Sequence, residues 1–152
     1  SFPSRLLSGL RGERGRAVVK GLLAPGFALV LWTGVLWGWV LVSRLPLLKA
    51  LRAGQRPPEG DPFPPEVRRI SANYNHLHEQ PTVFYAVLCL GTLAGAEAPL
   101  GVGAAWAYVI LRVAHSLEQA RRDRIPQRFA WFLMASLAHF VLTASVLWTW
   151  LA

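Results

Sequence analysis

Two long stretches without a charged residue constrain the fold more than any other feature of this sequence. The first runs from Gly21 to Ser43 and the second from Phe129 to Ala152, with twenty-three and twenty-four residues respectively. A helix rises about 1.5 Å per residue and a bilayer core is about 30 Å thick, so either stretch can cross a membrane. A soluble chain of 152 residues could not bury both. The sequence therefore predicts an all-α integral membrane protein that crosses the bilayer several times.

The charge balance is basic, with sixteen Lys and Arg against eight Asp and Glu. A basic chain can indicate nucleic-acid binding, but these charges lie between and beside the apolar segments, so we expect no nucleic-acid partner. Cys89 is the single cysteine and has no partner for a disulfide within the chain.

Four membrane spans are predicted, at about residues 22–43, 66–95, 99–120 and 126–151. Together they form one four-helix transmembrane domain over residues 22–152, preceded by a basic tail or surface helix over residues 1–21. The connection at residues 44–66 is rich in proline, and Pro57, Pro58, Pro62, Pro64 and Pro65 disfavour a continuous helix there. We expect no metal site, because His76 and His78 lie about 160° apart on one helix.

The distribution of basic residues predicts the orientation in the membrane. An even number of spans puts both termini on one side. The first and third connections and the adjoining helix ends hold ten basic residues, which makes that side cytoplasmic by the positive-inside rule. They are Arg44, Lys49, Arg52, Arg56, Arg68, Arg69, Arg121, Arg122, Arg124 and Arg128.

Two predicted spans carry polar stripes at membrane depth. Ionisable side chains there are costly and normally face the interior of a bundle, so both stripes are predicted to point inward. The surplus of arginines over carboxylates favours a pocket for an anionic ligand, and a purely structural ion pair between helices is the alternative. The stripes are Arg68, Asn75 and Glu79 in the second span, and Tyr108, Arg112, His115 and Gln119 in the third.

Three motifs along the chain are similar to those of a known family. The run Asn73-Tyr74-Asn75-His76-Leu77-His78-Glu79-Gln80-Pro81, followed by Phe84-Tyr85, resembles the second-helix signature of the MAPEG family, the membrane-associated proteins of eicosanoid and glutathione metabolism. Arg112-Val113-Ala114-His115-Ser116 resembles the third-helix motif of its prostaglandin synthases, and Arg124-Ile125-Pro126-Gln127-Arg128 resembles their turn into the fourth helix. The resemblance covers about residues 22–150 and is closest to bacterial members, which implies a multi-pass protein of the bacterial inner membrane.

The resemblance implies a homotrimer that binds glutathione, or a related low-molecular-weight thiol, between subunits near the cytoplasmic face. Carried over by position, Arg128 would stabilise the thiolate and Arg44 would be a second active-site arginine. The expected binding residues are Arg68, Asn75, Glu79, Arg112, His115 and Gln119.

This chain departs from the family pattern at three places. Asn75 and Glu79 are four residues apart rather than three, which leaves Asn73 as an alternative; Gln119 replaces a tyrosine, and Phe129 replaces a serine. The predicted activity is conjugation of a lipophilic electrophile, or reduction of a lipid hydroperoxide, by glutathione. The alternative is a non-catalytic membrane scaffold or lipid-binding protein. A small transporter or channel subunit is the least favoured hypothesis, since the chain has no internal repeat.

Overall fold

Five α-helices make up the part of the chain that the computed structural model describes, which is residues 2–55, 62–79, 81–122 and 124–152. Side chains are described for these residues except 2–20, 77 and 79. The helices are α1 (Phe2–Arg52), α2 (Pro65–Glu79), α3 (Pro81–Leu93), α4 (Pro99–Arg121) and α5 (Ile125–Leu151).

The first helix is longer than the sequence predicts. α1 is continuous from Phe2, so the basic N-terminal segment and the first span belong to one helix of 51 residues. It also extends past Ser43 to Arg52, and the expectation that the connection begins at residue 44 is therefore wrong. Pro46 lies inside the helix. Pro62 and Pro64 lie in the connection between α1 and α2, and Pro65 begins α2.

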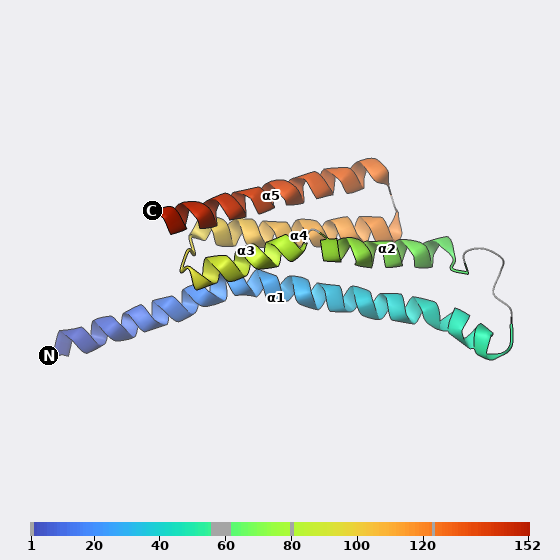
Figure 1. Ribbon diagram of the computed structural model, residues 1–152, viewed down its shortest axis with the longest axis horizontal. Coiled ribbons are helices and arrows are strands. Elements are labelled where there is room, and N and C mark those ends of the chain that lie inside the picture. Colours follow the sequence, from blue (N-terminus) through green and yellow to red (C-terminus); the bar gives the residue numbers. More distant parts are fainter. Residues whose placement is uncertain (1, 56–61, 80, 123) are drawn as a thin grey trace.

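The predicted second span is divided into two helices. α2 ends at Glu79 and α3 begins at Pro81, and position 80 lies outside the described residues. Proline has no N–H with which to bond to the carbonyl four residues earlier, which weakens a helix at that point. α2 and α3 lie end to end along the bundle (Figure 1).

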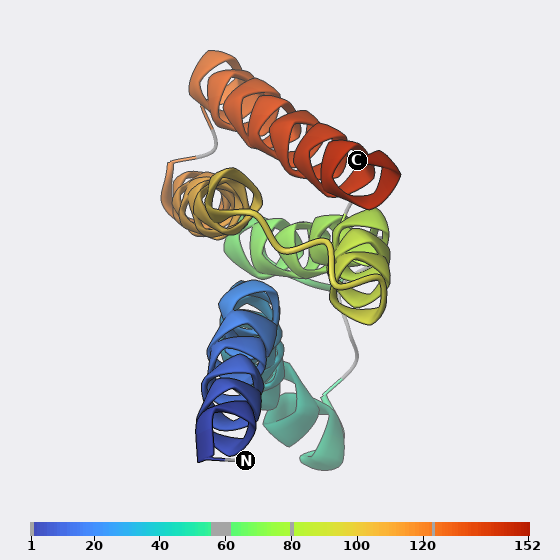
Figure 2. The ribbon, with the colours of Figure 1, turned by 90° about the vertical axis from the view of Figure 1, so that its left-hand side faces the viewer.

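The bundle places α4 and the α2–α3 pair between α1 and α5 (Figures 1 and 2). α4 and α5 form the most extensive helix pair, and α4 also packs against α1 and α2. α1 buries Leu22, Leu29 and Leu36, which recur every seven residues and so lie on one face. Both termini lie at the same end of the bundle in Figure 1.

Small residues allow two close helix contacts. A Cβ on Gly91 of α3 would lie 3.1 Å from Leu22 of α1 and 3.1 Å from Val146 of α5, and one on Gly101 would lie 3.1 Å from the Ser145 hydroxyl. Glycine is enriched where membrane helices approach closely, and these two positions fit that pattern.

The distribution of polarity suits a lipid environment. Large apolar side chains cover the outside, as at Leu31 and Leu93, whereas Arg112, Gln119 and Asn73 are buried. Within the part of the chain that the structure describes, three helical segments are long and apolar enough to cross a membrane: Gly21–Arg52, Pro99–Arg121 and Ile125–Leu151. Neither α2 nor α3 reaches that standard alone.

Candidate functional site

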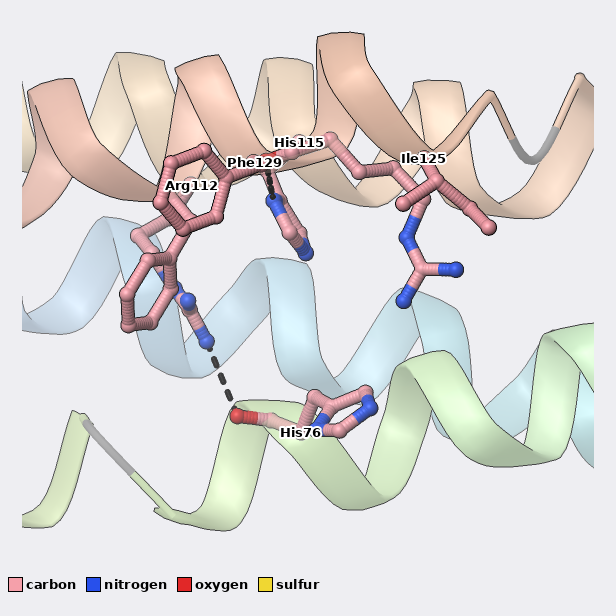
Figure 3. A pocket seen from close by; sticks show the side chains of 7 residues that line it. His76, Arg112, His115, Ile125 and Phe129 are labelled. Atoms are coloured by element: carbon pink, nitrogen blue, oxygen red, sulfur yellow. Dashed lines mark hydrogen bonds between the residues drawn. The ribbon is translucent and has the colours of Figure 1, made fainter.

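A cationic pocket of about 330 Å³ lies where α2, α4 and the first turns of α5 meet. Figure 3 shows its side chains converging from these helices. The pocket is lined by His76, Arg112, His115, Ile125, Arg128, Phe129 and Phe132. It therefore combines three of the predicted site residues, Arg112, His115 and Arg128, with one further imidazole and three apolar side chains.

Arg112 links α4 to the last turn of α2. Its side chain is 2% exposed, and Nη2 donates a hydrogen bond of 2.8 Å to the backbone carbonyl of His76 (Figure 3). The last carbonyls of a helix carry partial negative charge, so a guanidinium beside them stabilises the helix end. Arg112 thus has a structural contact on α2 while it lines the pocket.

His115 bridges α4 and α5. Its Nδ1 lies 3.0 Å from the backbone carbonyl of Arg128, and because a carbonyl oxygen only accepts hydrogen bonds, Nδ1 must carry the proton. In the neutral ring this leaves Nε2 as an acceptor. Figure 3 shows the ring turned so that its second nitrogen points toward His76 of α2, across the pocket.

A buried amide joins α2 and α4 beside this pocket. Asn73 is 1% exposed, and its Nδ2 donates a hydrogen bond of 3.1 Å to the carbonyl of Ser116, the residue after His115. Gln119 is also buried. The Asn73 Oδ1 has no hydrogen-bond partner among the described residues. The Asn73 bond fixes the spacing of the two helices that frame the pocket.

One face of α5 supplies the remaining wall. Ile125, Arg128, Phe129 and Phe132 are spaced three, one and three residues apart, so they share a side of the helix. Ile125 is 75% and Phe129 is 63% exposed on the single chain. The cationic interior therefore opens through an apolar rim onto the outer surface of the bundle.

The structure agrees with the prediction for one of the two polar stripes and differs from it for the other. The α4 stripe is confirmed, because Tyr108, Arg112, His115 and Gln119 are all buried. The inward direction predicted for the α2 stripe is wrong for the single chain: Arg68 and Asn75 are exposed. α2 turns Val67, Ile70 and Asn73 into the bundle instead, since this side of the helix carries its bulky aliphatic residues. The Glu79 side chain lies outside the described residues.

Arg44 lies apart from the pocket. Its Nη2 donates a hydrogen bond of 3.0 Å to the Ser71 hydroxyl, and its guanidinium carbon is 5.0 Å from the centre of the Phe63 ring. These contacts join the end of α1 to the start of α2. Within one chain, Arg44 is not among the residues that line the pocket.

Metal ligation finds no candidate cluster among the residues that the structure describes. No group of three or more His, Cys, Asp or Glu side chains is placed to hold an ion within that part of the chain. His139 is buried beside Tyr108, with ring centroids 5.6 Å apart, and its Nδ1 has no hydrogen-bond partner there.

Four pocket residues were not predicted as site residues. His76 entered the sequence analysis only as a possible metal ligand and as part of the Asn73–Pro81 motif, Ile125 only as part of the Arg124–Arg128 motif, and Phe129 only as a departure from the family pattern. Phe132 was not singled out. The signal that could have identified them is their helical spacing around Arg128, because any group on that face must border the arginine.

Comparison with known proteins gives one match. The family model of the MAPEG family matches residues 22–148, which is most of the chain. No curated protein and no solved structure matches it. The matched range contains every residue that lines the pocket, and the chain belongs to the MAPEG family.

Proposed function

We propose that this helical membrane protein is a glutathione-dependent transferase or peroxidase that acts on a lipophilic electrophile or a lipid hydroperoxide. The observation that carries the proposal is the pair of arginines, Arg112 and Arg128, in a pocket with an apolar rim. Family membership supports a glutathione-related role.

The pocket residues fit glutathione as the thiol substrate. The tripeptide has two carboxylates and a thiol, and guanidinium groups bind carboxylates through paired hydrogen bonds. A free thiol has a pKa of about 8.5 and is mostly protonated at neutral pH, and a nearby cation favours the thiolate. Arginine suits this role because it stays protonated itself. In this proposal Arg128 stabilises the thiolate, and Arg112 binds a carboxylate.

The apolar rim fits the second substrate. Phe129 and Phe132 lie beside Arg128 on the outer surface of the bundle, where lipid tails would surround them. A hydrophobic electrophile could thus reach the thiolate sideways from the bilayer without crossing water. Phe129 replaces the serine of the prostaglandin synthases, so we propose a general lipophilic substrate rather than a prostaglandin precursor.

The exposed stripe on α2 supports a homotrimer with sites between subunits. Asn75, His76 and His78 are exposed on the single chain, although this segment lies at the level of Arg112 in α4. Polar side chains at membrane depth are not left facing lipid. A second copy that covers this face would also bring the α2 stripe, with Arg68 and Asn75, toward a neighbour's pocket.

The same proposal completes the topology. The α2–α3 pair would provide the remaining crossing, with α2 in the cytoplasmic half of the membrane and α3 in the other half. The first and third connections would then be cytoplasmic, as the positive-inside rule predicts.

Arg128→Ala tests the catalytic assignment. We expect glutathione thiolate formation, followed by its ultraviolet absorbance in detergent, to be lost while the oligomer remains intact by size-exclusion chromatography. The matched control is Arg121→Ala, which removes an exposed arginine outside the pocket and should leave the signal unchanged. An Arg128→Ala protein with the full thiolate signal would contradict the assignment.

A non-catalytic scaffold or lipid-binding protein is the second candidate. It is favoured by the use of Arg112 on a backbone carbonyl, a contact that does not require a ligand. Calorimetric titration with glutathione separates the two. Absence of binding at millimolar glutathione, with the oligomer intact, would favour the scaffold.

A further inference from the structure

The imidazole of His115 occupies a defined chemical state within the pocket. Its Nδ1–H is held by the backbone carbonyl of Arg128 at 3.0 Å, which fixes the neutral tautomer with a lone pair on Nε2. The ring is buried on α4, and Nε2 points into the pocket toward α2 (Figure 3). The neutral His115 therefore offers a hydrogen-bond acceptor in a pocket whose charged side chains, Arg112 and Arg128, can only donate.

The surroundings of His115 explain how it stays neutral before a substrate arrives. Arg112 from its own helix, Arg128 from α5 and His76 from α2 face the same space among the described residues. The two guanidiniums remain protonated at any physiological pH, and they oppose a further positive charge on the imidazole. An incoming thiol supplies both a proton for Nε2 and a compensating negative charge.

We propose that His115 is a catalytic residue, the base that accepts the thiol proton; this rests on the proposed function. The S–H bond breaks with its electron pair remaining on sulfur, and an N–H bond forms at Nε2. The product is a thiolate and an imidazolium, so the net charge of the site does not change. An adjacent base of this kind is a general way to activate a nucleophile. Arg128 then stabilises the thiolate, and the Arg128 carbonyl continues to orient the imidazolium.

Substitution of His115 by asparagine or glutamine distinguishes the roles of the two ring nitrogens. In His115→Asn the side-chain amide can replace Nδ1 as the donor to the Arg128 carbonyl, but nothing replaces Nε2. In His115→Gln the amide reaches the position of Nε2, yet it cannot take up a proton near neutral pH. Both variants should lose the proton acceptor, and only His115→Asn should retain the contact between α4 and α5.

The experiment measures proton release when glutathione binds. Calorimetric titration of the detergent-solubilised wild type is run at neutral pH in two buffers of different ionisation enthalpy, together with the thiolate absorbance. We expect the wild type to form thiolate with almost no proton released to the buffer, because His115 keeps it. His115→Asn should bind glutathione and either lose at least about tenfold of the thiolate or release about one proton per thiolate formed.

Other outcomes overturn the proposal. Release of a full proton by the wild type as thiolate forms would contradict it without any variant. A His115→Asn protein with the wild-type thiolate yield, pH dependence and proton count would show that His115 is only structural. Absence of glutathione binding by the folded wild type would instead overturn the proposed function, and this inference with it.

Discussion

The contact of α3 with α1 and α5 at Gly91 gives the most quantitative test of the fold. Gly91 is buried, and a Cβ there would lie 3.1 Å from a Leu22 methyl and 3.1 and 3.2 Å from the two Val146 methyls. Carbon atoms pack best at about 3.5–4.0 Å, so three contacts would be too short by roughly 0.3–0.9 Å. Gly91→Ala should therefore force the Leu22 and Val146 side chains, which lie on the two neighbouring helices, to move by a few tenths of an ångström.

The expected magnitude comes from a matched comparison. Overpacking of a well-packed core costs about 1–3 kcal/mol, while alanine is favoured over glycine within a helix by up to about 1 kcal/mol. Gly103→Ala has the second effect alone, because a Cβ at Gly103 would meet no atom within 4 Å. The difference between the two variants isolates the contact. Gly91→Ala should be less stable than Gly103→Ala by about 1–3 kcal/mol.

The assay is reversible unfolding in mixed micelles with increasing sodium dodecyl sulfate, followed by far-ultraviolet circular dichroism. A second variant, Val146→Ala, removes the two methyls that a residue-91 Cβ would contact on α5. Combining it with Gly91→Ala should recover about 1 kcal/mol relative to the sum of the single effects, since neighbouring residues couple by 0.5–3 kcal/mol. Equal stabilities for Gly91→Ala and Gly103→Ala, together with additive single effects, would refute the packing of α3 between α1 and α5.

Two further predictions follow from buried polar groups. Asn73→Leu should lower the free energy of unfolding by about 0.5–1.5 kcal/mol in the same assay, because it removes the hydrogen bond to the Ser116 carbonyl while nearly keeping the side-chain volume; unchanged stability would mean that this bond does not hold α2 to α4. Burial raises the pKa of the Glu97 carboxyl, in the turn between α3 and α4. The folded state then binds this proton more tightly than the unfolded state, so its contribution to stability is fully present below the unfolded-state pKa and is lost as pH rises through the higher folded-state pKa. Glu97→Gln should flatten that dependence in unfolding experiments across mildly acidic pH, and an identical pH dependence in the variant would contradict the burial.

The apolar spans and the α4 stripe could be predicted from the sequence because each had a single physical solution. α4 carries Tyr108, Arg112, His115 and Gln119 on one face. Exposure of that polar face to lipid would be costly, so it turns toward the interior of the bundle. The remaining residues of α4 are almost all apolar, so the helix had only one way to turn. Its bounds, Pro99–Arg121, agree with the predicted span at 99–120 to within a residue.

α2 could not be predicted in the same way, because it has polar groups on both sides. Asn73 faces the bundle beside Val67 and Ile70, while Asn75 lies on the exposed side. The sequence pattern predicts the inward face of α2 from the number of polar residues on each side. In the fold, the inward face is instead the side whose aliphatic groups fit against a neighbouring helix. The tertiary partner of Asn73 is a backbone carbonyl of α4, which no sequence pattern marks.

The intrachain contacts of Arg44 could not be predicted for a related reason. Its sequence context, at the end of an uncharged stretch, is the same whether it reaches a pocket or a loop. In the structure Arg44 contacts Ser71 and Phe63, which the connection after α1 brings back beside that helix. Long-range pairing of this kind depends on the path of the connection, and local spacing does not encode that path.

The residues of the pocket differ in how firmly the surrounding helices hold them. Arg112 and His115 sit on α4, which packs against α1, α2 and α5, and both are fixed by bonds to backbone carbonyls of other helices. A backbone carbonyl remains in place when the side chain of its residue is substituted. The guanidinium of Arg112 and the imidazole of His115 therefore keep their positions as neighbouring residues vary. Phe129 has no such constraint, because it is 63% exposed on the rim. Substitution there changes what the rim contacts without disturbing the bonds behind it. Under the proposed function, the preference for a lipophilic partner would therefore change at Phe129 while Arg112 and His115 keep their positions.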